Sequence, residues 1–310
     1  MASDDGVATA RGVRATGSGQ IWKSPSVVSN HRRRVLKDRL AKGLAAACLL
    51  AVLVPLADML YMFAYRGLQV ISIEKLTTIT VGSASFVSGG LANAIVGTLL
   101  LIALASLITV PLGLLGGVYM AEFSDHRLSE ALRFAADVLA GNSSIVLGYV
   151  GYLVFVLYFG WGYSALAGAL TLSILMFPYV FRTTELAMRK VPSSIKEAAI
   201  ALGSTKSTMI NRVVLRFALP GIATGVLLAI GIGLSETAPL LYTASFSNYL
   251  PNGALTHNPV GYLTYVVYVY SQLPSNAAHN LAYLSSFILI AIVLGLNVVA
   301  RVALRRVSKV

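Results

Sequence analysis

The sequence predicts an all-α polytopic membrane protein with six membrane-spanning helices, and three observations support this prediction. First, 56% of the 310 residues are hydrophobic and only 12% are charged, which is about half the charged fraction of an ordinary soluble domain. Second, the apolar residues form runs that are long enough to cross a bilayer at the helical rise per residue. Third, 22 of the 24 Lys and Arg residues lie either in the two ends of the chain or in every second connection between these runs.

Residues 1–42 precede the first run, and we expect them to form a disordered, basic cytoplasmic tail. Their first part is rich in small and polar residues, and His31–Lys42 is a basic cluster. A basic cluster before an apolar run is also typical of a signal peptide. Because this run continues from Gly43 to Ala64, we predict a retained first span. The transmembrane domain is then expected over residues 43–300, followed by a basic tail over 301–310.

Five further apolar runs complete the predicted set of spans. They are Leu91–Met120, Ser143–Phe159, Tyr163–Phe181, Gly221–Ala244 and Leu281–Val299. In the second span, Pro111 and the nearby glycines predict a kink and close helix contacts. Residues 122–141 have apolar side chains at helical spacing, which fits either a helix on the cytoplasmic face or a bent inner helix. Residues 245–280 are predicted to be an outer segment.

The distribution of positive charge predicts the orientation of these spans. Only Arg66 and Lys75 lie on the side opposite the other basic residues. By the positive-inside rule, both ends of the chain are cytoplasmic and the protein is a multi-pass component of the plasma membrane. The formal charge of +12 is therefore explained by topology beside membrane lipid, and no nucleic acid partner is expected. Cys48 is the single cysteine, so an intrachain disulfide is excluded.

A polar, basic segment from Val191 to Pro220 separates the fourth and fifth spans. Pro192 and the two serines after it predict the start of a helix with serine capping. Glu197 lies in the first turn, where a carboxylate suits the positive end of the helix. Gly203 is placed to end this helix in the left-handed conformation. A second helix is expected from about Thr205 to Phe217.

This segment resembles the EAA loop of ABC-importer permeases. The resemblance rests on Glu197, Ala198 and Ala199, a spacing of three residues to Gly203, and the later pair Leu219-Pro220. It implies a cytoplasmic coupling loop over residues 185–220 that docks on an ATPase. The alternative is an ordinary cytoplasmic loop that lies on the lipid headgroups.

Three other segments resemble the PstA-type permeases of phosphate importers. They are Asp137–Val146, Phe181–Glu185 and Gly233–Leu241, which read DVLAGNSSIV, FRTTE and GLSETAPLL. The resemblance implies a MetI-like permease fold and import of inorganic phosphate. It also implies a related PstC-type permease, a dimer of PstB-type ATPases and an external phosphate-binding protein as partners. Transport of sulfate, molybdate or another oxyanion is the alternative, followed by a membrane protein without a transport role.

Arg182 and Glu185 are candidates for the substrate path. They are three residues apart and can pair on one helix face. A hydrated phosphate ion needs compensating donors in the membrane, and the planar fork of arginine binds two oxygens at once. The resemblance places this pair in the path. The alternative is that Arg182 only begins a basic flank and extends toward the headgroups.

Glu236 is the third path candidate because it lies within an apolar run, where an unpaired charge is costly. It would be a counter-ion or a gate element beside the path, with the helix broken near Pro239. Alternatively, it is a protonated carboxyl at a helix contact. Ser143 and Ser144 begin a span, where they either hold an anion or cap the helix. Asp58 fits the outer interface better than the path.

No enzymatic activity is expected from this chain. The sequence contains no Walker A glycine loop, and its four histidines have no metal-ligand spacing. No cofactor or metal is therefore expected here, and ATP and Mg²⁺ are expected on the separate ATPase.

Overall fold

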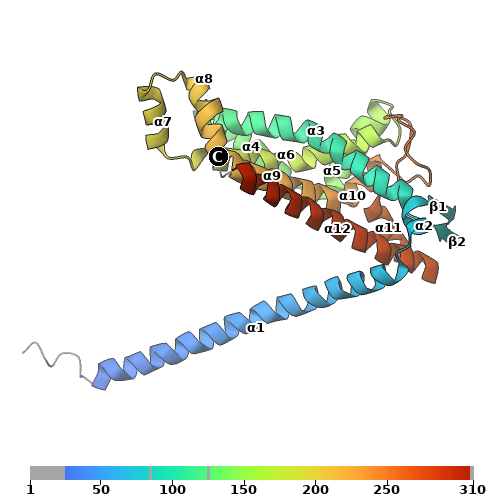
Figure 1. Cartoon of the computed structure of the whole chain (residues 1–310), viewed down its shortest axis with the longest axis horizontal. Helices are drawn as coiled ribbons and strands as arrows, with labels where there is room; N and C mark the ends of the chain where they lie inside the picture. Colours follow the sequence, from blue (N-terminus) through green and yellow to red (C-terminus); the bar gives the residue numbers. More distant parts are fainter. Residues whose placement is uncertain (1–24, 84–85, 124–125, 308–310) are drawn as a thin grey trace, which may run out of the picture. The chain divides into compact units, whose positions relative to one another are not determined.

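The computed structural model describes residues 25–83, 86–123 and 126–307. The chain divides into two compact units, one up to Tyr61 and one from Met62 onward. Figure 1 labels the elements. Their bounds are α1 Pro25–Val70, α2 Ile73–Thr77, β1 Thr80–Ser83, β2 Phe86–Gly89, α3 Ala92–Glu122, α4 His126–Gly141, α5 Ser144–Gly151, η2 Tyr152–Tyr158, α6 Ala165–Arg189, α7 Ser193–Ala201, α8 Lys206–Thr208, η3 Met209–Val214, α9 Leu215–Ser235, α10 Ala238–Thr243, α11 Leu263–Tyr270 and α12 Asn276–Val307. The segments η2 and η3 are π-helical.

Within the described residues, five helices are long and apolar enough to cross a membrane, and a sixth span results if α4 and α5 count as one bent pair. The predicted span Ser143–Phe159 is therefore incomplete by itself. It corresponds to α5 and η2, and it is joined to α4 through a bend of 101°. Residues 126–141 form α4, which is joined through this bend to α5, so the two helices make up a broken span or a re-entrant loop.

The first helix differs from its predicted bounds. It begins at Pro25 rather than near Gly43, so the basic cluster His31–Lys42 is helical. Residues 1–24 of the predicted tail lie outside the described part of the chain. At the other end, α12 continues to Val307 through most of the predicted basic tail.

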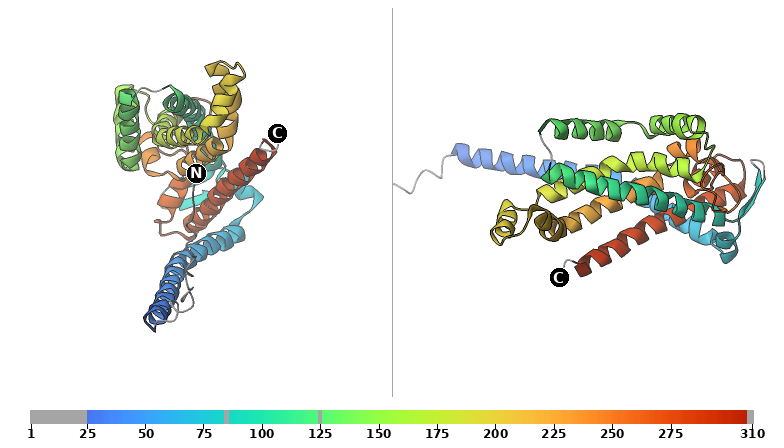
Figure 2. Two further views of the ribbon diagram at one scale, coloured as in Figure 1. Left: turned by 90° about the vertical axis from the view of Figure 1, so that its left-hand side faces the viewer. Right: turned by 90° about the horizontal axis from the view of Figure 1, so that it is seen from above.

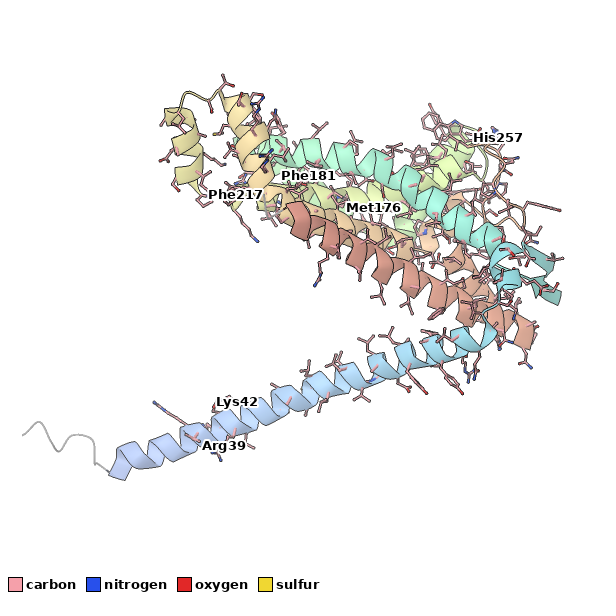
Figure 3. The ribbon with its side chains drawn as sticks, in the orientation of Figure 1. Arg39, Lys42, Met176, Phe181, Phe217 and His257 are labelled. Carbon is pink, nitrogen blue, oxygen red and sulfur yellow. The ribbon has the colours of Figure 1, made fainter. Side chains whose placement is uncertain are left out.

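Close helix contacts at the predicted glycines hold α3 against α6. A Cβ added at Gly113 would lie 2.8 Å from Val180, and one added at Gly117 would lie 2.5 Å from the Cβ of Thr184. Without side chains at these positions, the two backbones approach closely enough for dense packing. α3 is a single helix through Pro111. Met176 and Phe181 on α6 are buried (Figure 3).

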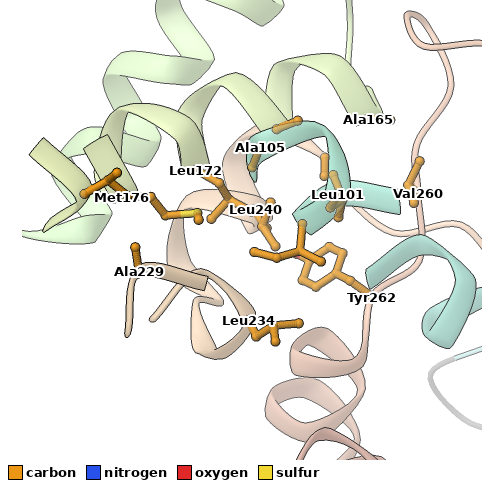
Figure 4. Packing of buried hydrophobic residues seen from close by; sticks show 14 residues of the cluster. Leu101, Ala105, Ala165, Leu172, Met176, Ala229, Leu234, Leu240, Val260 and Tyr262 are labelled. Atoms are coloured by element: carbon orange, nitrogen blue, oxygen red, sulfur yellow. The ribbon is translucent and has the colours of Figure 1, made fainter. Parts of the chain in front are cut away.

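The main core lies where α3, α6, α9 and α10 meet (Figure 4). Leu101, Leu172, Leu240 and Tyr262 are almost completely buried there. Tyr262 belongs to residues 245–280, which were predicted to be an outer segment. That prediction is incomplete, because α11 within this stretch buries Leu263 and Val266 in a second core with α12. The segment therefore folds back into the protein.

The two ends of the second unit are occupied by different elements. The antiparallel hairpin of β1 and β2 pairs Thr80 with Gly89 and lies at one end (Figure 1). This hairpin was not predicted from the sequence. α7 and α8 lie at the opposite end, beside the C-terminal ends of α3 and α12, as two views agree (Figures 1 and 2).

Candidate transport and coupling sites

A cluster of charged side chains surrounds Glu185 near the C-terminal end of α6. The Glu185 side chain is only 2% exposed. Its Oε2 atom lies 3.2 Å from Nη1 of Arg182, which confirms the pair expected from their spacing. Its Oε1 atom accepts hydrogen bonds from Nε and Nη2 of Arg133 at 2.9 and 2.6 Å. Nε of Arg189 lies 3.1 Å from the same oxygen, so three guanidinium groups compensate one buried carboxylate.

Arg182 also binds Asp137 on α4. Its Nη2 atom lies 2.8 Å from each carboxylate oxygen, and its Nε lies 3.2 Å from Oδ1. The fork of Arg182 is thus occupied by an internal carboxylate in a bidentate arrangement, the geometry that also suits an oxyanion. The Asp137 side chain is 60% exposed. Asp137 is therefore the more accessible of the two carboxylates that Arg182 binds.

No role was predicted for Arg133 or Asp137. A signal was present, because these residues are four apart and share one face of an amphipathic helix. What was missing was the packing of α4 on α6, which brings this face to Arg182. With three arginines and two carboxylates, the cluster carries one net positive charge. It can attract an anion while its own charges remain mostly compensated.

Glu236 lies at the predicted helix break. α9 ends at Ser235, and Pro239 occupies the first turn of α10. The Glu236 carboxylate shares a hydrogen bond with Ser144. The backbone carbonyl of Glu236 accepts a hydrogen bond of 2.9 Å from the Thr264 hydroxyl. This break is therefore bound to both α5 and α11.

Ser143 and Ser144, at the start of α5, do not form the helix cap that was predicted for them. Ser143 occupies the N-cap position, but its side chain makes no capping hydrogen bond within the described residues. Ser144 instead binds Glu236. The side-chain capping predicted for Ser143 is wrong, because its hydroxyl accepts no hydrogen bond from the first turn of α5.

Glu236 and Arg182 occupy different levels of the protein. Glu236 lines a small cavity with Leu172 of α6 and Tyr262. Arg182 follows Leu172 by ten residues on the same helix, a rise of about 15 Å. The structure therefore places the predicted path residues at two levels, with Arg182 and Glu185 together at one level and Glu236 at the other.

The predicted coupling segment contains the expected first helix, α7, and a glycine turn after it. α7 ends before Gly203, whose φ of +82° lies in the left-handed region, as expected for a glycine that ends a helix. Pro192 occupies the N-cap position without a side-chain hydrogen bond, so the expected serine capping is wrong. The second helix does not end near Phe217 but runs from Lys206 through to Ser235.

The two faces of α7 differ in exposure. Glu197 and Ala198 are exposed, whereas Ala199 is buried. Ile200 and Leu202 are 55% and 88% exposed. An acidic side chain beside exposed apolar side chains on one short helix is a surface suited to a protein partner.

Comparison with known proteins identifies the family. A family model described as "Binding-protein-dependent transport system inner membrane component" matches residues 113–309. The chain belongs to this family. Members are permease subunits of ABC transporters, and this chain is accordingly a multi-pass membrane permease and not an enzyme.

Relatives of similar length carry a more specific description. The phosphate transport system permease protein PstA 2 of Mycobacterium bovis is 41% identical over 278 residues, which cover 90% of this chain and 91% of the relative. PstA of Yersinia pestis is 38% identical over 271 residues, covering 86% and 89% of the two chains. The probable PstA of Methanocaldococcus jannaschii is 35% identical over 281 residues, covering 90% and 98%.

Solved structures confirm the MetI-like permease fold. The inward-facing MetNI methionine ABC transporter matches with a TM-score of 0.56 and 18% identity, covering 70% of this chain and 97% of that chain. A bacterial ABC transporter involved in the import of the acidic polysaccharide alginate matches with a TM-score of 0.53 and 16% identity, covering 86% and 98%. The chain therefore shares the fold of these two transporters over most of its length.

Proposed function

We propose that this permease forms half of the translocation path of an ATP-driven importer of inorganic phosphate. The observation that carries the proposal is the 41% identity to a PstA protein over 90% of the chain. The partners in this proposal are a PstC-type permease, a PstB-type ATPase dimer and an external phosphate-binding protein. ATP and Mg²⁺ would be bound by the ATPase.

The orientation in this proposal has both chain ends in the cytoplasm. Lys and Arg residues gather in the connections on the side of α7, which the positive-inside rule assigns to the cytoplasm. The described end of α12 lies at the same end of the second unit as α7 (Figure 2). The coupling helix would then face the compartment that contains ATP.

Arg182 would offer a fixed positive charge to the anion near the inner end of the path. Phosphate presents two oxygens to a guanidinium fork in the same way as a carboxylate does. The anion would replace the exposed Asp137 on Arg182, while the buried Glu185 keeps Arg182 in position. Exchange between two anions of similar geometry allows binding without trapping, which transport requires.

Glu236 would stabilise the broken helix beside the path rather than bind the substrate, because a carboxylate repels phosphate. Glu197, Ala198, Ala199 and Gly203 would form the docking surface for the ATPase. Exposed Glu197 and the left-handed turn at Gly203 support this assignment.

The experiment is uptake of labelled phosphate by cells in which the gene for this chain is deleted and then restored. We expect high-affinity uptake to disappear and return, with an excess of unlabelled phosphate competing and sulfate or molybdate not competing. Competition by sulfate or molybdate would assign another oxyanion. Unchanged phosphate uptake after the deletion would contradict the proposal.

A further inference from the structure

Three cationic side chains, one from the last residue of α6 and two from the segment between α6 and α9, contact the C-terminal end of α3. Nη2 of Arg189 donates a hydrogen bond of 3.1 Å to the carbonyl of Met120. Nζ of Lys196, on α7, pairs with Oε1 of Glu122 at 2.5 Å. Nζ of Lys206, on α8, lies 4.5 Å from the ring centre of Phe123. The coupling segment is thus attached to one short stretch, residues 120–123, at three positions.

These contacts compensate an unfavourable arrangement at the end of α3. The last carbonyls of a helix lack partners within the helix and form the negative end of its dipole. Glu122 adds a carboxylate there, and its side chain is only 7% exposed. A nearly buried carboxylate at a negative helix end requires a cation, and Lys196 supplies it. The pair is shielded from water and is therefore stronger than an exposed surface pair.

Apolar packing supports the same attachment. Buried residues of the coupling segment form one cluster that also includes side chains of α3. The cluster contains Ala199 of α7, Met209, Ile210 and Val214 of η3, and Leu114, Val118 and Ala121 of α3. α3 is in turn packed against α6 through Gly113 and Gly117. A continuous set of contacts therefore leads from α7 through α3 to the helix that carries Arg182.

We propose that the end of α3 is where the coupling segment transmits its movement to the transmembrane helices. In this proposal Glu122 and Lys196 are positioning residues that make α7 and α3 move together. Lys196 and Ala199 connect α7 to the membrane domain, while Glu197 and Ala198 remain exposed for the ATPase. The inference rests on the proposed function, because it assumes ATP-driven import.

The test is a charge exchange in the reconstituted complex of permeases, ATPase and binding protein. Lys196→Glu and Glu122→Lys are made separately and together, and phosphate uptake per ATP hydrolysed is measured. Each single variant should retain the ATPase but lower this ratio about fivefold or more. The double variant should recover most of the ratio. Lys190→Glu, the same charge change at an exposed position of the same segment, should leave the ratio unchanged.

The proposal would be overturned if the single variants and the unchanged chain took up the same amount of phosphate per ATP hydrolysed. It would also be overturned if the single variants lost uptake and the double variant did not recover it. Should a reversal prevent assembly, Lys196→Gln and Glu122→Gln provide the same comparison with a smaller perturbation, and an unchanged ratio in both would again overturn it. Failure of the proposed function appears separately, as absence of phosphate uptake by the unchanged complex. The charge exchange is then judged by the rate of ATP hydrolysis alone.

A cross-link provides a second measurement. Cysteines replace Glu122 and Lys196 in a Cys48→Ser background, and a short bifunctional thiol reagent joins them. Loss of the ion pair should lower phosphate uptake per ATP hydrolysed in the double-cysteine chain, and the cross-link should raise this ratio again if α7 and α3 move together. Loss of uptake on joining the two cysteines, with each single-cysteine chain unaffected by the reagent, would show that they must separate during transport and would overturn the proposal.

Discussion

At the residue scale, all three nitrogen atoms of the Arg182 guanidinium, Nε, Nη1 and Nη2, donate hydrogen bonds to carboxylates. Asp137 is exposed, whereas Glu185 is almost completely buried. In the proposed mechanism, replacement of Asp137 by a passing anion would leave Glu185 to hold the guanidinium in place. Since Glu185 also binds Arg133 and Arg189, its removal would leave several charges uncompensated, and we expect it to serve structure as much as transport.

Substitution of Arg182 tests this role. Arg182→Gln should lower phosphate uptake per assembled complex by about tenfold or more, since a charged hydrogen bond contributes about 1.5–3 kcal/mol. Arg182→Lys should restore only part of the uptake, because ammonium keeps the charge but loses the planar fork. The matched control is Arg216→Gln, which removes one charge at an exposed inner position. Normal uptake per complex in Arg182→Gln would remove Arg182 from the mechanism.

Sequence spacing predicted the pair of Arg182 and Glu185 because both residues lie on one turn of one helix. It did not predict Arg133 or Asp137 as their partners. Those contacts depend on the bend between α4 and α5, which places a separate helix against α6. Local periodicity reports which face of a helix is polar, but not which other helix that face will contact.

At the scale of elements, α7 and the turn that follows it are the proposed coupling unit. Glu197→Lys should weaken docking of the ATPase, because it reverses an exposed charge. Gly203→Val should also uncouple transport, because a β-branched residue is strained at a φ of +82°. Gly203→Asn is the matched control, since asparagine tolerates this conformation, and it should retain coupling.

The measurement is the amount of copurified ATPase together with phosphate uptake. If the Glu197→Lys and Gly203→Val variants transport phosphate at the original rate, the assignment of α7 as the coupling helix is wrong.

The contact between α3 and α6 gives a prediction for stability. In Gly117→Ala, the added methyl group would lie 2.7 Å from the carbonyl oxygen of Phe181 and 2.5 Å from Thr184. Such overpacking should destabilise the protein by about 1–3 kcal/mol. Gly231→Ala makes the same change in α9, where the described chain leaves open space around the methyl group.

Thermal denaturation of the purified complex in detergent provides the comparison. The midpoint should fall for Gly117→Ala and stay the same or rise slightly for Gly231→Ala. Equal midpoints for both variants would show that α3 and α6 do not pack as described.

At the scale of the whole molecule, hydropathy and the lengths of the apolar runs predicted the spans well because the bilayer imposes length and polarity on each helix. They did not predict that residues 245–280 return to the core through α11, or that β1 and β2 form a hairpin. Both features depend on contacts between segments outside the long apolar runs, where the membrane imposes no simple pattern.

Cysteine labelling in intact cells tests the orientation of these spans. In a Cys48→Ser background, a cysteine at Asn252 should react with a membrane-impermeant reagent, and a cysteine at Ser204 should react only after the membrane is opened. The reverse pattern of labelling would invert the proposed topology and place α7 away from the cytoplasm.

The most direct measurement of the central claim is ATP-dependent phosphate transport by the purified complex in proteoliposomes. The complex contains this chain, its partner permease, the ATPase and the phosphate-binding protein, with labelled phosphate on the side of the binding protein. We predict accumulation of phosphate that requires ATP and that an excess of sulfate leaves unchanged. Transport of sulfate or molybdate in preference to phosphate, or no ATP-dependent transport by an intact complex, would contradict the account.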